Sequence, residues 1–367
     1  MPALLTGLCA AALGLTGCAP DPAPEPAATL TTTAEPAAEP VHFTIRTVGD
    51  ILIHSDVYNT ANRYAGGEGY DFGPMFDEVR DYLQNADITT GNLEVPVAGA
   101  EFGLSGYPAF NAPPQIVDAL QDAGVDIVNN ATNHTLDRGG DGVVASVSNL
   151  RERGMLYAGG YDSWEDKATP RVIDVNGVKV GFLGYSYGTN GIPVPEGREY
   201  SVALIDDAMP DEITALDDDV DMTVVMIHMG EEYEPLPVQF QRDTAQTAVD
   251  AGADLVLGGH PHVVQPFELV AGGTPVWWSH GNFLHGQWDE RTKVGGIGEF
   301  AFTRSADGAV TLDRIRFMPT YTVGPPISYE HKVLPLVRAH EYIDVAATFA
   351  ELRERLGPDV EIVEYLD

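Results

Sequence analysis

Residues 255–265, LVLGGHPHVVQ, join a run of apolar residues to two glycines and a His-x-His pair. A short, continuous apolar run is typical of a strand buried on both faces, as in a parallel sheet covered by helices. The glycines end this strand, so His260 and His262 follow its carboxyl end. Ligands of open α/β sheets bind at the carboxyl ends of the strands. The stretch therefore predicts a buried sheet with a binding site at its edge.

The chain around this stretch repeats the alternation of strands and helices. We expect strands at residues 41–50, 86–94 and 125–134, separated by helices at 72–86 and 113–124 and followed by a helix at 139–154. This βαβ series indicates a largely parallel sheet. Further on we expect a hairpin at 169–186 with an Asn-Gly turn, a strand at 221–230 and a helix at 238–252. Segments 263–270, 274–283, 296–303 and 310–319 read as antiparallel strands, and 342–357 as a final helix.

The composition excludes some classes of partner. The 367 residues carry 55 acidic and 20 basic side chains, a formal net charge of -35. Such a surface repels nucleic acid and anionic lipid, so we expect no nucleic-acid partner.

The first 40 residues have the pattern of a secreted lipoprotein. Residues 3–17 are almost all apolar or small, which is the size of a signal-peptide core and short for a bilayer span. The sequence LTGC at 15–18 resembles a lipobox, in which Cys18 is lipidated. We therefore expect a signal peptide at 1–18, a Pro/Ala/Glu/Thr-rich tether at 19–40, the main domain at 41–325 and a C-terminal extension with a helix at 326–367. The expected location is extracytoplasmic, with the lipid anchored in the cell membrane.

Polar residues with ligand character follow nearly every expected core strand. Five of the 10 histidines fall at such ends. Imidazole and carboxylate are ligands preferred by Zn, Mn and Fe, so a divalent metal site is expected. A His-x-His pair on extended backbone would point its rings to opposite sides and could serve two ions ~3.5–4 Å apart. The candidates are Asp50, His54, Asn92, Glu94, Asn133, His134, Asp137, His228, Glu231, His260 and His262.

The ordered series GD, GNLE, NHTLDRGGDGV, HMGEEYEPLP, GGHPHVVQ and SHGNF resembles the CapA family of poly-gamma-glutamate capsule biosynthesis, from about Phe43 to Tyr321. That family is similar to the calcineurin-like metallophosphoesterases. The resemblance implies an α/β fold in which two β-sheets are flanked by helices. It also implies a site holding one or two divalent ions (Mn, Zn or Fe).

The same resemblance implies a role for each matching residue. Asp50, Asn133, His228, His260 and His262 correspond to metal ligands. His134 corresponds to the histidine that acts on the substrate, as general acid.

Two positions depart from the superfamily pattern. Leu52 stands where a histidine ligand is usual, and His54 could replace it only if its loop turns inward. Asn92 stands where a bridging aspartate is usual. A ligand between two cations should be a carboxylate, so Glu94 is expected to bridge.

Each candidate also has a plainer interpretation. Asp50 could be a turn residue and His54 an ordinary loop residue. Glu94 and Asn133 could satisfy buried backbone groups, His134 could cap a helix, and His228 could be a core histidine.

Other residues are expected to support the site. Asp137 and Glu231 are expected to orient histidines, Asn282 to shape the pocket wall, and Tyr233 to lie near the opening with Pro235. The segment GYSYG at 184–188 matches a nucleophile elbow, but no helix can follow it, so Ser186 is expected to be structural.

The implied function is capsule polymer synthesis, export or anchoring, with metal-assisted hydrolysis or transfer at a phosphoryl or acyl centre. Expected partners are an anionic polymer or phosphoester substrate, capsule synthetase or export proteins of the membrane, and the membrane itself through Cys18. Two alternatives stay open: a non-catalytic polymer-handling subunit and a generic extracellular phosphoesterase.

Overall fold

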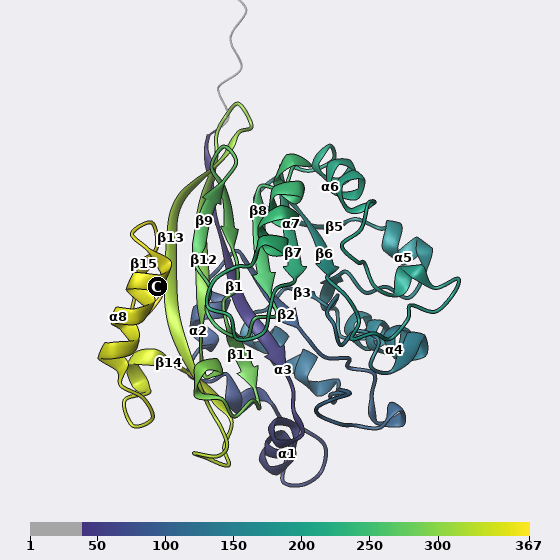
Figure 1. Cartoon of the computed structure of the whole chain (residues 1–367), viewed down its shortest axis with the longest axis vertical. Helices are drawn as coiled ribbons and strands as arrows, with labels where there is room; N and C mark the ends of the chain where they lie inside the picture. The colour runs from purple at the N-terminus through teal and green to yellow at the C-terminus, as the bar shows by residue number, and fades with distance from the viewer. Residues whose placement is uncertain (1–38) are drawn as a thin grey trace, which may run out of the picture. The chain divides into compact units, whose positions relative to one another are not determined.

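The computed structural model describes residues 39–367, which form one unit containing two β-sheets (Figure 1). The expected signal peptide, Cys18 and nearly all of the expected tether lie outside the described residues. Within residues 39–367, no helix combines the length and the apolar character needed to cross a bilayer.

The first sheet has nine strands and the second has six. The first runs in the order β14 (Lys332–Pro335), β13 (Val310–Val323), β12 (Val294–Arg304), β1 (Val41–Leu52), β2 (Ile88–Leu93), β3 (Ile127–Asn129) and β4 (Leu156–Ala158), with β11 (Asn282–His285) beside β1 and β15 (Glu361–Ile362) beside β13. The second runs in the order β5 (Arg171–Val175), β6 (Val178–Ser186), β7 (Met222–His228), β8 (Leu255–Gly259), β10 (Thr274–Trp277) and β9 (Phe267–Val270).

Helices flank the two sheets (Figure 1). Helices α6 and α7 contact the second sheet, α4 contacts β4, and β1 and β3 reach across to β8 and β6. The expected architecture of two β-sheets flanked by helices is confirmed. The helices are α1 (Ser55–Tyr64), α2 (Arg80–Gln84), α3 (Gln115–Ala123), α4 (Gly139–Glu152), α5 (Trp164–Ala168), α6 (Met209–Asp217), α7 (Gln239–Asp250) and α8 (Val345–Leu356).

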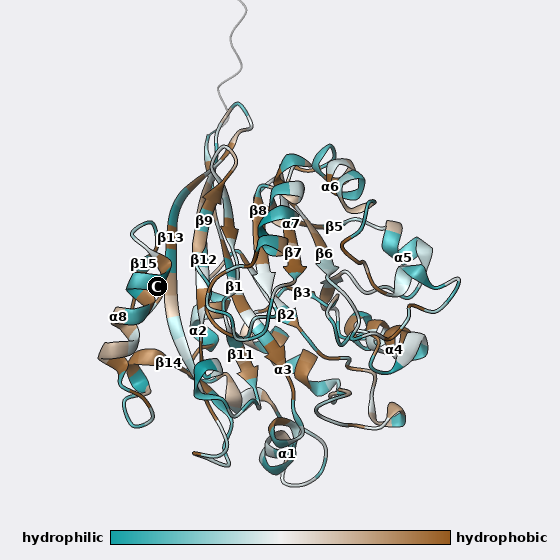
Figure 2. Ribbon diagram, viewed as in Figure 1, coloured by the Kyte–Doolittle hydropathy of each residue, from teal (hydrophilic) through white to brown (hydrophobic). Residues whose placement is uncertain are grey.

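Apolar side chains from strands of both sheets pack together in one buried cluster. Ile45 of β1, Phe182 of β6 and Val224 of β7 belong to one buried cluster and are at most 2% exposed. Burying each such side chain contributes about 1.5–3 kcal/mol relative to leaving it in water. Figure 2 shows the central strands of both sheets as predominantly hydrophobic. This cluster fixes the strands and therefore the positions of the loops that follow them.

Local signals in the sequence explain several element boundaries. Helix α8 begins where the Asp344 side chain accepts a hydrogen bond from the Ala347 amide, and α3 ends at Gly124 with φ 106°. The expected hairpin is confirmed, with both turn residues, Asn176 and Gly177, at positive φ.

Three expectations about elements were wrong in extent or direction. The strand expected at 125–134 ends at Asn129, because the Asn129 side chain accepts a hydrogen bond from the Ala131 amide and turns the chain. The helix expected at 72–86 is a 3-10 turn at Gly73–Met75 followed by the short α2. Strand β10 is parallel to β8 and β11 is parallel to β1, although β9 pairs antiparallel with β10, and β12 with β13, as expected.

Candidate metal centre

The carboxyl ends of β1, β2, β7 and β8 meet at one place between the two sheets. Strand register aligns Asp50 with Asn92 in the first sheet and His228 with Gly259 in the second. Parallel strands present their carboxyl ends at the same edge, so side chains far apart in sequence converge there.

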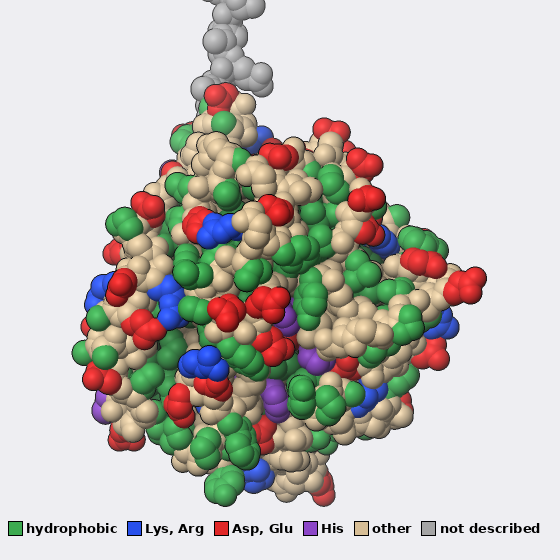
Figure 3. All heavy atoms as spheres, in the orientation of Figure 1, with side chains coloured by type: hydrophobic (Ala, Val, Ile, Leu, Met, Phe, Trp, Pro, Cys, Tyr) green, Lys and Arg blue, Asp and Glu red, His purple; other side chains and the backbone are tan. Residues whose placement is uncertain are grey.

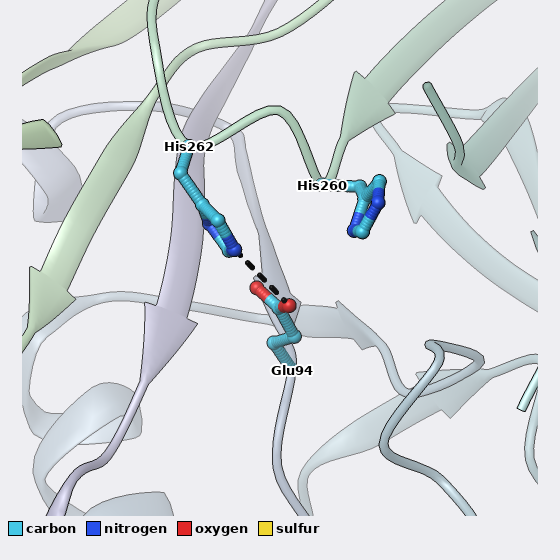
Figure 4. Close-up of side chains that lie close together, drawn as sticks. All are labelled: Glu94, His260 and His262. Atoms are coloured by element: carbon cyan, nitrogen blue, oxygen red, sulfur yellow. Dashed lines mark ion pairs between the residues drawn. The ribbon is translucent and has the colours of Figure 1, made fainter. Parts of the chain in front are cut away.

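The Glu94 side chain lies at the middle of this convergence and has no hydrogen-bond partner. It is fully buried, and neither carboxylate oxygen finds a donor. Its Oε1 lies 3.6 Å from Nε2 of both His228 and His262, and Figure 4 shows Glu94 and His262 pointing toward each other. Burial raises the pKa of Glu94 well above its usual value, and the nearby carboxylate of Asp50 adds to this effect. An ionised carboxylate needs a cation at this position.

Two sets of side chains are arranged to hold a metal ion. Glu94 with His260 and His262 forms one set, and Glu94 with Asp50 and His228 forms the other, with the ligand atoms of each set within 4.8 Å of one another. Glu94 belongs to both sets, which agrees with the carboxylate expected between two cations. Its bridging role stays a prediction.

The His-x-His segment does not have the extended backbone that the sequence suggested. His260 and His262 have φ values of 100° and 60°, in the left-handed region that L residues rarely adopt. The two rings lie 5.9 Å apart and share one candidate set. This strained turn lets the His260 amide contact Asp50 at 3.2 Å. Gly259 allows the approach, because a Cβ there would lie 2.7 Å from Asp50 Oδ1.

The two histidines of this pair have opposite electrostatic surroundings. Burial lowers the pKa of His262, but the carboxylates of Glu94 and Asp50 outweigh it and raise the pKa to about 9. Burial, with His262 close by, lowers the pKa of His260 to about 3. The His260 Nδ1 atom is buried without a partner. His260 is therefore a neutral imidazole with an available ring nitrogen, as a metal ligand requires.

Asn92 positions ligands at the place where the superfamily has an aspartate. Its Nδ2 donates to Asp50 Oδ1 at 2.7 Å and lies 2.9 Å from His228 Nδ1. Its own oxygen accepts from Asn129 at 2.9 Å. The amide orients an aspartate of one sheet and a histidine of the other.

His228 and Asn133 contact each other directly. The His228 Nε2 atom lies 2.8 Å from Asn133 Oδ1, and both residues are buried. Burial lowers the pKa of His228 well below its usual value, so its ring is neutral. His228 and Asn133 are two of the residues that the resemblance assigns to a metal.

His134 is held in a fixed orientation beside the centre. Its Nδ1 lies 2.7 Å from Asp137 Oδ2, and the Phe110 ring packs edge-on against the imidazole at 4.7 Å. The Phe110 amide also donates to Asp137 at 2.6 Å. Asp137 thus orients His134, as expected, and leaves the other ring nitrogen available for proton transfer.

His54 and Glu231 do not lie where the sequence placed them. His54 is absent from both metal sets; its Nδ1 contacts main-chain atoms of Leu52 and Gly286, and burial lowers its pKa to about 4. Glu231 was expected to orient a histidine, but it is exposed and lines a surface cavity that His260 also borders. We call this cavity the opening. His54 lies two residues after β1 and Glu231 three residues after β7, and the conformation of each loop keeps the side chain out of both metal sets.

Asn282 has a closer role than the expected pocket wall. Its Oδ1 lies 3.0 Å from His262 Nδ1, the same ring nitrogen that the Asp50 carboxylate contacts. Tyr233 lies at the opening as expected, while Pro235 lines a neighbouring cavity that Tyr233 also borders. The Ser186 hydroxyl donates to the Gly188 carbonyl at 2.9 Å, and no helix follows it.

Two residues of the opening were missed by the sequence interpretation. The Tyr187 ring lies 4.7 Å from His260, and Glu232 borders the same opening. Tyr187 directly follows β6, so the rule that identified the other strand-end residues could have found it. Figure 3 shows acidic side chains gathered beside exposed histidine atoms on this face.

The fold and the buried cluster define a two-sheet α/β protein with histidine, aspartate and glutamate side chains gathered at the carboxyl ends of its strands. Residues 44–287 match the family described as bacterial capsule synthesis protein PGA_cap, and the chain belongs to that family.

Two bacterial relatives and one solved structure are similar to this chain. The capsule biosynthesis protein CapA of Bacillus anthracis is 32% identical over 262 residues, covering 68% of this chain and 62% of that protein, less than two thirds of its length. The PGA biosynthesis protein CapA of Bacillus subtilis (strain 168) is 28% identical over 274 residues, covering 71% and 68%. A phosphatase structure from Mycoplasma pneumoniae has 13% identity and a TM-score of 0.48, over 78% of this chain and 95% of that one.

Proposed function

We propose that this chain uses a divalent metal centre to hydrolyse or transfer a phosphoryl or acyl group during the synthesis, export or attachment of an anionic capsule polymer. The observation that carries the proposal is the buried Glu94 carboxylate, unpartnered and surrounded by Asp50, His228, His260 and His262. Membership of the capsule synthesis family supports the polymer as the biological context.

The donor set fits Mn, Zn or Fe. It consists of imidazole nitrogens and carboxylate oxygens, with Asn133 as a further oxygen donor. A bound metal would act as a Lewis acid toward a phosphoryl or acyl oxygen. A bound cation would also stabilise the ionised form of Glu94, whose carboxylate oxygens have no hydrogen-bond donor in the protein.

The remaining residues of the site handle orientation and protons. Asp137 holds the His134 ring through Nδ1, so Nε2 can carry a proton to a leaving group. Asn92 and Asn282 fix the metal-binding side chains by hydrogen bonds. General acid catalysis of this kind typically contributes about 10²–10⁴-fold to the rate.

We also propose that the protein acts outside the cytoplasm, attached to the membrane through a lipid on Cys18. The apolar segment at 3–17, the LTGC sequence and the Pro-rich residues 19–40 support this location.

The experiment is elemental analysis of bound metal, together with turnover of phenyl phosphate, whose basic leaving group needs a proton, by the wild type, His260→Ala and His134→Ala. We expect metal in the wild type, less metal in His260→Ala, and unchanged metal but about 10²–10⁴-fold lower turnover in His134→Ala. Metal without turnover of any ester would favour the polymer-handling subunit. A wild type that binds none of Mn, Zn and Fe would contradict the proposed chemistry.

A further inference from the structure

The opening of the metal centre is acidic and aromatic. It is a cavity of about 520 Å³ lined by Tyr187, Gly230, Glu231, Glu232, Tyr233, Val238, Phe240 and His260. No Lys or Arg belongs to this lining. His260 lines the cavity and also belongs to a candidate metal set, so the cavity borders the proposed centre.

The two carboxylates of the opening are not neutralised by the protein. Within residues 39–367, neither Glu231 nor Glu232 forms an ion pair, and both are exposed. The nearby Arg291 is paired with Asp289 at 2.6 Å and lies over the outer Tyr233 ring. Glu232 lines the same cavity as Tyr187 and Tyr233. Burial raises the pKa of both tyrosines to about 12, and the Glu232 carboxylate adds to this effect.

Aromatic faces surround these carboxylates. Tyr187 and Phe240 are 40% and 47% exposed, although large rings are usually covered, and Tyr233 borders the same space. Aromatic rings attract cations through their negative faces, and rings combined with carboxylates are the usual surroundings of a bound ammonium group.

We propose that this opening binds an ammonium group of the substrate while the reacting group meets the metal centre. The inference rests on the proposed function and narrows its substrate class to zwitterions. In an acidic polymer, the free amino end would fit this opening, whereas a run of carboxylates from the middle of the polymer would be repelled by Glu231 and Glu232.

The test compares two phosphate compounds that differ only in the amine. Binding of phosphoethanolamine and of ethyl phosphate to the manganese-loaded full chain is measured by calorimetry at low ionic strength, where exposed charges are least screened. We expect phosphoethanolamine to bind about fivefold more tightly, the size typical of a solvent-exposed charge pair. The preference should disappear in the double variant Glu231→Gln, Glu232→Gln.

Glu234→Gln is the matched control. Glu234 is an exposed glutamate two residues from Glu232, but it does not line the cavity. This variant should keep the full preference. Loss of the preference in Glu234→Gln to the same extent would indicate a general field of negative charge and overturn the assignment to the opening.

A second probe tests the opening without the metal. Choline carries a quaternary ammonium and no phosphate, and its contact with the metal-free chain can be followed by saturation-transfer NMR. A choline signal that the double variant lacks would support the opening even if the metal chemistry fails. Equal binding of the two phosphates with no choline signal would overturn this inference and leave the metal centre standing.

Discussion

Two glutamates of this protein are equally buried and have opposite surroundings. Glu94 and Glu299 are 0% and 1% exposed. Glu299, on β12, accepts hydrogen bonds from Arg46 at 2.6 and 2.9 Å and from Arg316 at 2.6 Å. Glu94, after β2, accepts none. Burial favours the protonated form of both, but the arginines hold the pKa of Glu299 below its usual value, whereas the pKa of Glu94 is raised.

The difference separates a structural charge from a functional one. At Glu299 the protein itself supplies the compensating cations, and Arg46 also donates to main-chain oxygens of Tyr82 and Asp367. At Glu94 no arginine plays this part. The surrounding groups are imidazoles and the Asp50 carboxylate, and the one imidazole with a raised pKa, His262, lies 3.6 Å away without a hydrogen bond. A buried group left without a partner costs stability, and such cost is commonly found at sites that bind something.

The largest effect is expected from removing the structural carboxylate. Glu299→Ala leaves the Arg46 guanidinium buried without its counterion, which should lower the free energy of unfolding by about 3–5 kcal/mol. Urea denaturation followed by circular dichroism measures this loss. If the alanine variant does not fold, Glu299→Gln serves instead with a smaller loss. A loss below about 1 kcal/mol would remove the basis of the comparison.

Metal addition should stabilise the protein through the other glutamate. Manganese at 100 times its dissociation constant should raise the free energy of unfolding by about 2.7 kcal/mol, because it binds only the folded chain. Thermal unfolding with and without manganese, and again after chelation, measures the shift. Glu94→Met should abolish the shift and Glu299→Gln should preserve it. The reverse pattern would show that the metal binds near Glu299 and not at Glu94.

The metal-free protein should respond oppositely to the same change at the two positions. Glu94→Met removes a buried acceptor that has no donor, so stability should rise by about 1 kcal/mol. Glu299→Met should lower stability, since it leaves Arg46 and Arg316 without the carboxylate that accepts their hydrogen bonds. Denaturation in the presence of a chelator compares the two variants. A clear loss of stability in Glu94→Met would mean that Glu94 has a structural partner after all.

The smallest expected effect is the pH dependence of the stability that Glu299 contributes. The folded pKa of Glu299 is lowered, so its contribution to stability is present above the unfolded pKa and is lost as pH falls toward the folded pKa. The difference in unfolding free energy between wild type and Glu299→Gln should therefore be largest near neutral pH and shrink below about pH 4.5. Urea titrations from pH 7 to pH 3 measure it. A difference that grows in acid would contradict the sign.

Much of the candidate site could be predicted from sequence because its residues follow strands. Asp50, His228 and His260 stand directly after or at the end of an apolar run, and parallel strands bring such positions together. His54 and Glu231 lie further into loops, where a few backbone angles decide the direction of a side chain. No periodicity encodes those angles, so the sequence alone does not decide that these two side chains lie outside both metal sets.

The partners of each ligand were harder to predict than the ligands. Asn92 contacts both Asp50 and His228, which belong to different sheets. Asn282 and Asp50 both contact Nδ1 of His262. These contacts depend on which strands of the two sheets face each other. The GYSYG motif points to Ser186 as the chemical group, but it is Tyr187 that borders the opening. Tyr187 directly follows β6, as the other strand-end residues follow their strands.

By itself, the sequence determined the strands with continuous apolar runs, the hairpin with its Asn-Gly turn, the alternation that makes the first sheet largely parallel, and the set of imidazoles and carboxylates at strand ends. These features follow from side-chain chemistry over a few neighbouring residues. Only the tertiary structure decided that β10 runs parallel to β8 and β11 parallel to β1. It also decided that the His-x-His segment is left-handed, and that Glu94 is buried without a donor while Glu299 has two arginines. Those outcomes depend on contacts between residues as much as 253 positions apart, as for Arg46 and Glu299, and such contacts exist only once both sheets have formed.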